Sequence, residues 1–123
     1  PILEPEYDIK AADRAEGEDI LKAEILKNLE TLADDRQVML KLSIPVKANL
    51  YKELVDHPKV LAVVALSGGY STEEACAELA KNDGMIASFS RAMLQDLRAQ
   101  QSDEEFDATL DKAIDSICAA SVA

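Results

Sequence analysis

Lys41 is the residue whose type and position could do chemistry most directly. It lies in the middle of the apolar run at residues 38–44, which ends before Pro45. A short run that begins and ends with β-branched residues predicts a buried strand, whose side chains alternate between two faces. We expect cover on both faces, which makes a charged amine costly and leaves Lys41 as a neutral nucleophile for a Schiff base. The alternative is a lysine that points into solvent or pairs with a carboxylate.

Polar residues gather where each predicted strand ends. These groups are Glu4 with Glu6, Lys41 with Ser43, Ser67-Gly68-Gly69 and Ser88-Phe89-Ser90-Arg91. In parallel α/β folds, the carboxyl ends of the strands are where chemistry gathers. Taken singly, each group has an ordinary explanation: a solvated acidic turn, a turn that needs glycine, or a surface arginine.

Taken together, the groups suit a phosphorylated carbonyl substrate. We expect the backbone N–H groups of Gly68 and Gly69, and those of a helix start near Ser90, to point at an anion. Arg91 would add planar, bidentate donors for a phosphate. A carboxylate on one strand beside an amine on the next supplies the proton shuttle that Schiff-base formation requires.

The elements that must position these groups alternate along the chain. We expect strands at residues 1–3, 38–44, 60–66 and 85–90, and helices at 16–32, 49–55 and 72–81. A further helix starts near Arg91 and carries Met93 and Leu97, and capping boxes at Ser71/Glu74 and Ser102/Glu105 mark two helix starts. This alternation predicts a parallel α/β sheet, and the length suits about half of a (β/α)8 barrel or a small open sheet.

The composition limits the classes of partner. The chain has 123 residues and a net charge of -11, which suits one globular domain and argues against nucleic acid and anionic membrane surfaces. No apolar run approaches the ~20 residues of a membrane span. Cys76 and Cys118 lack metal or redox spacing, so we expect small buried residues in a reducing, cytoplasmic compartment. His57 is the only histidine, so we expect chemistry without a metal or other cofactor.

Four ordered segments resemble class I fructose-bisphosphate aldolase, most closely the shorter bacterial type. They are residues 1–6 (PILEPE), 38–41 (VMLK), 64–71 (VALSGGYS) and 86–92 (IASFSRA), and the likeness runs through the whole chain. The resemblance implies that residues 1–123 are the C-terminal half of a (β/α)8 TIM barrel, with parallel strands and covering helices, entering at the end of the fifth strand. It also implies an aspartate and a lysine on earlier strands as further catalytic residues. The terminal tyrosine of the animal-type enzymes is absent.

The resemblance also implies roles for individual residues. Lys41 is the Schiff-base lysine, Glu4 is the proton-transfer acid/base, and Glu6 is the neighbouring carboxylate of the same motif. Residues that resemble a phosphate site are Ser67, Gly68, Gly69, Ser88, Ser90 and Arg91. The implied activity is the reversible cleavage of fructose 1,6-bisphosphate to dihydroxyacetone phosphate and glyceraldehyde 3-phosphate in glycolysis, with a phosphorylated sugar as partner.

Two alternatives stay open. The chain could be an inactive structural half that pairs with its N-terminal half or with another copy in a homo-oligomer, because a half-barrel leaves its inner face and its edges unpaired. It could also belong to another Schiff-base aldolase that acts on a different phosphosugar.

Overall fold

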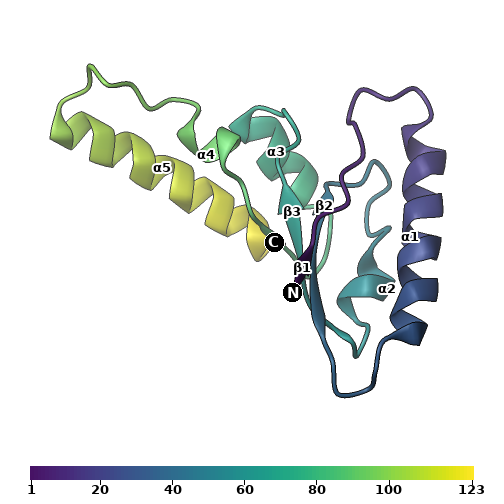
Figure 1. Ribbon diagram of the computed structural model, residues 1–123. Helices are drawn as coiled ribbons and strands as arrows, with labels where there is room; N and C mark the ends of the chain where they lie inside the picture. The colour runs from purple at the N-terminus through teal and green to yellow at the C-terminus, as the bar shows by residue number, and fades with distance from the viewer.

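The computed structural model describes residues 1–123 and shows an α/β fold built on one parallel sheet (Figure 1). Its strands lie in the order β1 (Ile2–Leu3), β2 (Val38–Ser43), β3 (Val60–Leu66) and β4 (Met85–Ala87). Each neighbouring pair is parallel. The strands therefore all end at one edge of the sheet, which brings the loops that follow them together and confirms the predicted parallel α/β class.

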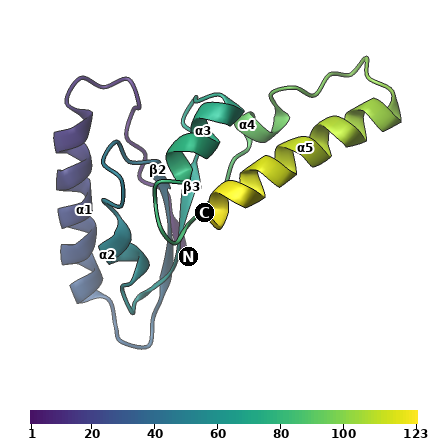
Figure 2. The ribbon, with the colours of Figure 1, turned by 180° about the vertical axis from the view of Figure 1, so that it is seen from behind.

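Five helices follow the strands: α1 (Arg14–Thr31), α2 (Lys52–Val55), α3 (Thr72–Leu79), α4 (Arg91–Leu94) and α5 (Asp103–Ser121). In Figures 1 and 2 the strands stand at the centre, with α1 and α2 at one flank and α3, α4 and α5 at the other. One helix follows each strand, and α5 is added at the end of the chain. This order is the predicted alternation.

Both predicted capping boxes are present, which explains where α3 and α5 begin. The Ser71 hydroxyl accepts a hydrogen bond from the Glu74 amide, and the Glu74 carboxylate accepts one from the Ser71 amide. Ser102 and Glu105 repeat this pattern at the start of α5. Each box pairs backbone N–H groups that a helix start otherwise leaves without a partner.

Three predicted boundaries were wrong, each for a local reason. The second helix begins at Lys52 and not at residue 49, because Asn49 has a left-handed φ of 61°. The strand β4 ends at Ala87 and not at residue 90, because Ser90 has already turned to helical angles. Leu97 does not lie on α4, which ends at Leu94 and continues in a tight turn.

The core lies on one face of the sheet. Leu40 and Leu42 are fully buried, and their register partners on β3, Val63 and Ala65, point to the same side. They form one cluster with side chains from all five helices, which include Leu29, Leu54, Ala75, Leu79, Ala92 and Ala120. Burying one leucine contributes roughly 1.5–3 kcal/mol, so this cluster holds the helices to the sheet.

The opposite face of the sheet is only partly covered, so the prediction of strands covered on both faces was wrong. Ile2 and Ile86 lie on this face and are 51% and 43% exposed. The physical reason is that the helices pack against the side chains of the other face. We call this surface, with Ile2, Met39, Lys41 and Ile86, the open face.

The two cysteines differ from each other. Cys76 is half-buried in α3, and burial, together with the charge of Glu73, raises the pKa of its thiol. Cys118 is exposed on α5, so the prediction of a buried side chain was wrong there. The reason is that α5 is incompletely covered, as its exposed apolar residue Ile114 also shows. None of the helices combines the length and the apolar character needed to cross a membrane.

Candidate active site

Lys41 and Glu4 lie side by side on the open face. Leu3 on β1 is in register with Leu40 on β2, so the next residues of both strands point to the same side. The distance between Lys41 Nζ and Glu4 Oε2 is 3.3 Å. The carboxylate beside an amine is therefore present. The prediction that these groups are shielded from water was wrong. The Lys41 side chain is 25% exposed and the Glu4 side chain is 56% exposed, on a face that lacks a covering layer.

Ser43 holds the carboxylate segment beside β2. Its buried hydroxyl donates to the Tyr7 carbonyl at 2.8 Å and accepts from the Tyr7 amide at 3.0 Å. The Tyr7 ring then lies against the backbone of Gly17, where an added Cβ would come within 2.1 Å of the ring. These contacts fix the chain just after Glu4 and Glu6, which explains why two exposed carboxylates keep a defined place.

The loop after β3 is a tight glycine turn. Gly68 and Gly69 have φ values of 62° and 100°, a region that residues with a Cβ rarely adopt. The turn is closed by a hydrogen bond of 3.0 Å from the Tyr70 amide to the Ser67 carbonyl. Some turns of this kind present successive amides to an anion, and that role stays a prediction for this loop.

Arg91 lies at the start of α4, beside the end of β4. Its side chain is exposed and makes no hydrogen bond or ion pair, so all its donors are available. The helix itself has four residues, and its N-cap residue Ser90 makes no capping hydrogen bond. A turn this short cannot provide the helix-start anion site that the sequence predicted, so the guanidinium is the group with that capacity here.

These residues surround one polar hollow, which we call the site hollow. It has a volume of about 180 Å³ and is lined by Glu4, Glu6, Lys41, Leu66, Ser67, Gly68, Ser88, Ser90 and Arg91. Every residue of the predicted site therefore lines it except Gly69. The structure brings the residues together, and their chemical roles stay predictions.

A larger hollow of about 360 Å³ lies between β1 and α1. Its lining is mainly apolar, and Leu21, Ile25 and Leu32 belong to it. Glu24 is the only charged side chain in the lining, and it forms an exposed ion pair with Lys27, which does not line the hollow. No group of three or more His, Cys, Asp or Glu side chains is placed to hold a metal ion.

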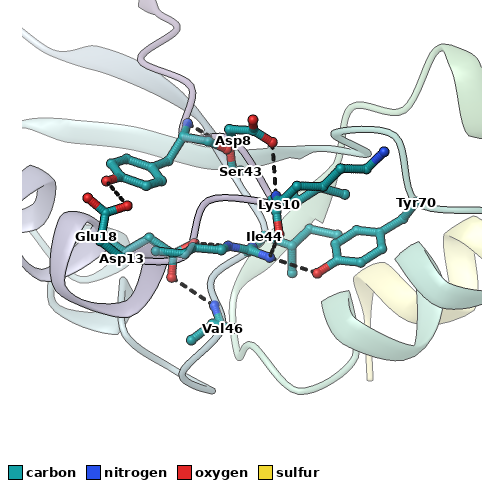
Figure 3. A network of polar contacts seen from close by, with 11 residues as sticks. Asp8, Lys10, Asp13, Glu18, Ser43, Ile44, Val46 and Tyr70 are labelled. Atoms are coloured by element: carbon teal, nitrogen blue, oxygen red, sulfur yellow. Dashed lines mark hydrogen bonds and ion pairs between the residues drawn. The ribbon is translucent and has the colours of Figure 1, made fainter.

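Sequence reasoning missed a buried polar network at the same edge of the sheet (Figure 3). We call it the rim network, and its members are Arg14, Glu18, Ile44, Val46 and Tyr70. Arg14 Nε donates to Glu18 Oε1 at 2.7 Å, and Glu18 Oε2 accepts from the Val46 amide at 2.8 Å. Both charged side chains are buried.

The rim network keeps the Arg14 guanidinium charged. Burial opposes the charge, but hydrogen bonds to Tyr70 and Glu18 outweigh it and leave the pKa of Arg14 above its ordinary value. A signal for the network existed in the sequence: Arg14 and Glu18 extend the helical stripe of Leu21 and Ile25, so two charges occupy positions that face the core.

No family model matches the chain. The resemblance of the four segments to class I aldolase stays a prediction.

Proposed function

We propose that this chain carries the Schiff-base site of a class I fructose-bisphosphate aldolase, which reversibly cleaves fructose 1,6-bisphosphate to dihydroxyacetone phosphate and glyceraldehyde 3-phosphate. The observation that carries the proposal is the 3.3 Å contact between Lys41 Nζ and Glu4 Oε2 inside the site hollow. An amine beside a carboxylate is the pair that forms and hydrolyses an imine.

The chemistry follows from these two groups. Lys41 loses a proton and attacks the ketone carbon of the sugar, and Glu4 lies close enough to accept that proton and return it to the departing water. The resulting iminium accepts the electrons of the bond between its α and β carbons as that bond breaks, which leaves an enamine on Lys41. Glu4, again unprotonated after the departure of water, accepts the proton of the β-hydroxyl, whose carbon leaves as the aldehyde. Glu6 lines the same hollow and adds a second carboxylate to this end of the site.

The other side of the site hollow supports a phosphate. Gly68 contributes turn amides, and Ser67, Ser88 and Ser90 contribute hydroxyl or amide donors. Arg91 has a guanidinium without a partner in the chain, and such a group binds phosphate through two parallel hydrogen bonds. A phosphate held here fixes the substrate carbonyl relative to Lys41, which is the orientation that the reaction needs.

The remaining strands of a barrel would cover the open face. In a (β/α)8 barrel the face that carries Lys41 points to the barrel interior, where side chains of other strands cover it. The parallel order of β1 to β4 and the one-sided packing of the helices suit a half-barrel. Under this proposal the missing cover is the remaining half of the barrel.

Borohydride trapping tests the proposal. Incubation with dihydroxyacetone phosphate and borohydride should attach the reduced ketone to Lys41, as read by peptide mass spectrometry. Lys41→Arg keeps the charge but cannot form the imine, so it should abolish the label. Lys47 is an exposed lysine that also pairs with a carboxylate, and it serves as an internal control. Equal labelling of Lys41 and Lys47, or no label on Lys41, would refute the assignment.

The open face favours a second candidate, a structural half that binds its counterpart or another copy. Ile2 and Ile86 are exposed large apolar side chains on this face, and β1 and β4 are edge strands. Light scattering on the 123-residue chain measures whether it associates. A chain that turned over fructose 1,6-bisphosphate at a normal rate by itself would exclude this candidate.

The alternative of a Schiff-base aldolase with a different substrate range is tested by comparing the cleavage of fructose bisphosphate with that of other phosphoketoses.

A further inference from the structure

The rim network joins the loops that follow three strands (Figure 3). Arg14 Nη1 donates to the Tyr70 hydroxyl at 2.8 Å, in the loop after β3. Arg14 Nη2 donates to the Ile44 carbonyl, in the loop after β2. Nη1 also lies 3.4 Å from the Ile9 carbonyl, in the segment after β1. One guanidinium therefore contacts the segments that follow β1, β2 and β3.

Glu18 prevents this guanidinium from turning. The Glu18 carboxylate binds Arg14 Nε with one oxygen and the Val46 amide with the other. Both charged side chains are at most 6% exposed, so water cannot replace these contacts. The planar guanidinium offers its donors at fixed angles, and with Nε held, its two other nitrogens keep their directions.

The contacts of Arg14 lie next to the proposed working groups. Ile44 follows Lys41 by three residues in the same extended segment. Tyr70 closes the glycine turn through its amide, and its ring lies 5.9 Å from the Arg14 guanidinium carbon. Arg14 therefore joins the end of β2 to the residue that closes the glycine turn.

We propose that Arg14, held by Glu18, is a positioning residue that fixes the glycine turn at the spacing required between a ketone carbon on Lys41 and a phosphate on the turn. This inference rests on the proposed function and assigns Arg14 and Tyr70 a part in selecting phosphorylated over unphosphorylated ketones. Neither residue lines the site hollow, so they act through the loops that they join.

Tyr70→Phe is the variant that separates this role from a purely structural one. It removes the contact to the loop after β3 and leaves the contacts of Arg14 to Glu18 and Ile44 in place. Substitution of Arg14 would instead leave Glu18 buried without its partner and unfold part of the chain. Tyr51→Phe is the matched control, because the buried Tyr51 hydroxyl has no hydrogen-bond partner.

The experiment compares two ketones in borohydride trapping on Lys41. For dihydroxyacetone phosphate, Tyr70→Phe should raise the half-saturating concentration by roughly 5- to 10-fold, the effect of losing about one hydrogen bond. For unphosphorylated dihydroxyacetone, the labelling should be unchanged, and Tyr51→Phe should match the wild type with both ketones. An equal change with both ketones, or no change with either, would overturn the proposal.

A second readout does not depend on the Schiff base. Titration with inorganic phosphate, followed through the NMR signals of the Gly68 and Gly69 amides, should show weaker binding in Tyr70→Phe than in Tyr51→Phe. If Lys41 takes no label in the wild type, the proposed function fails, and this titration alone decides the positioning role. Equal phosphate binding in the two variants, or no shift of these amides in the wild type, would overturn it.

Discussion

The Arg14–Glu18 pair and the Lys41–Glu4 pair both join a cation to a carboxylate at the carboxyl edge of the sheet. In the first pair both side chains are buried, and the charged groups also bind Tyr70, Ile44 and Val46. In the second pair both side chains are partly exposed, and neither side chain forms another ion pair or hydrogen bond. The first pair uses its hydrogen-bonding capacity inside the protein, whereas the second keeps capacity for a ligand.

This difference separates a pair that stabilises the fold from a pair that can take part in a reaction. A buried pair loses several kcal/mol when one partner is removed, because the other charge stays without solvent. An exposed pair contributes about 0–1 kcal/mol, so either residue can change its protonation or its partner at little cost to the fold. A group that takes part in a reaction needs the second kind of surroundings until its substrate arrives.

The largest expected effect comes from Glu18→Gln. The variant removes the negative charge beside Arg14 in a fully buried place, so the free energy of unfolding should fall by about 3–5 kcal/mol. Urea unfolding followed by circular dichroism measures this loss. Glu53→Gln is the control, because Glu53 forms an exposed ion pair with Lys22 and should cost less than about 1 kcal/mol. Equal losses in the two variants would remove the distinction between the pairs.

Gly68→Ala should have the next largest effect. Gly68 lines the site hollow, and its turn is closed by Tyr70 of the rim network. A non-glycine residue at φ 62° costs about 1–2 kcal/mol, and the new Cβ would lie 3.0 Å from Ile9 Cγ2. We expect this loss in urea unfolding, together with weaker binding of inorganic phosphate. Ser90→Ala changes another residue of the site hollow without backbone strain, and its stability should stay near that of the wild type.

Glu4→Gln tests the exposed Lys41–Glu4 pair. Stability should change by about 0–1 kcal/mol, since Glu4 is exposed, while labelling of Lys41 by dihydroxyacetone phosphate should slow by roughly 10²-fold or more. The labelling rate on the exposed Lys47 should be the same in wild type and variant. A variant that lost several kcal/mol of stability would show that Glu4 belongs to the scaffold.

Tyr51→Phe should have the smallest effect at neutral pH. It removes a buried hydroxyl that has no partner, so the free energy of unfolding should rise by up to about 1 kcal/mol. A loss of more than that amount would mean that the hydroxyl is bonded after all, through a buried water.

The same variant should change the alkaline limit of stability. Burial, and then the charge of Glu18, raises the pKa of Tyr51 above its ordinary value, so the folded chain keeps a proton that the unfolded chain releases above about pH 10. The contribution of Tyr51 to stability is therefore present below pH 10 and is lost as the pH rises further. We expect the decline above pH 10 to be shallower in Tyr51→Phe, as measured by urea unfolding at several pH values.

Local rules explain what could be predicted. The starts of α3 and α5 follow from Ser71 and Ser102 with their glutamates, which need no distant contact. The bounds of β3 follow from one uninterrupted apolar run. The gathering of Glu4, Lys41 and Arg91 follows from the parallel topology alone, since all strands end at one edge.

Distant contacts explain what could not be predicted. The position of Arg14 and Glu18 on the apolar stripe of α1 indicates that they face the core, but it does not identify their partners. Those partners are the backbone of Ile44 and Val46 and the Tyr70 hydroxyl, which lie far away in the sequence. The exposure of Lys41 depends on whether another layer covers its face, and the strand sequence contains no information about that layer.

Many of the contacts that hold the loops end on backbone atoms. Arg14 binds the carbonyl of Ile44, Glu18 binds the amide of Val46, and Ser43 binds both backbone groups of Tyr7. Bonds of this kind do not depend on the side chain of the loop residue. A laboratory library that randomises Val46, Lys47 and Ala48 to residues other than proline should therefore keep the course of the main chain in that loop.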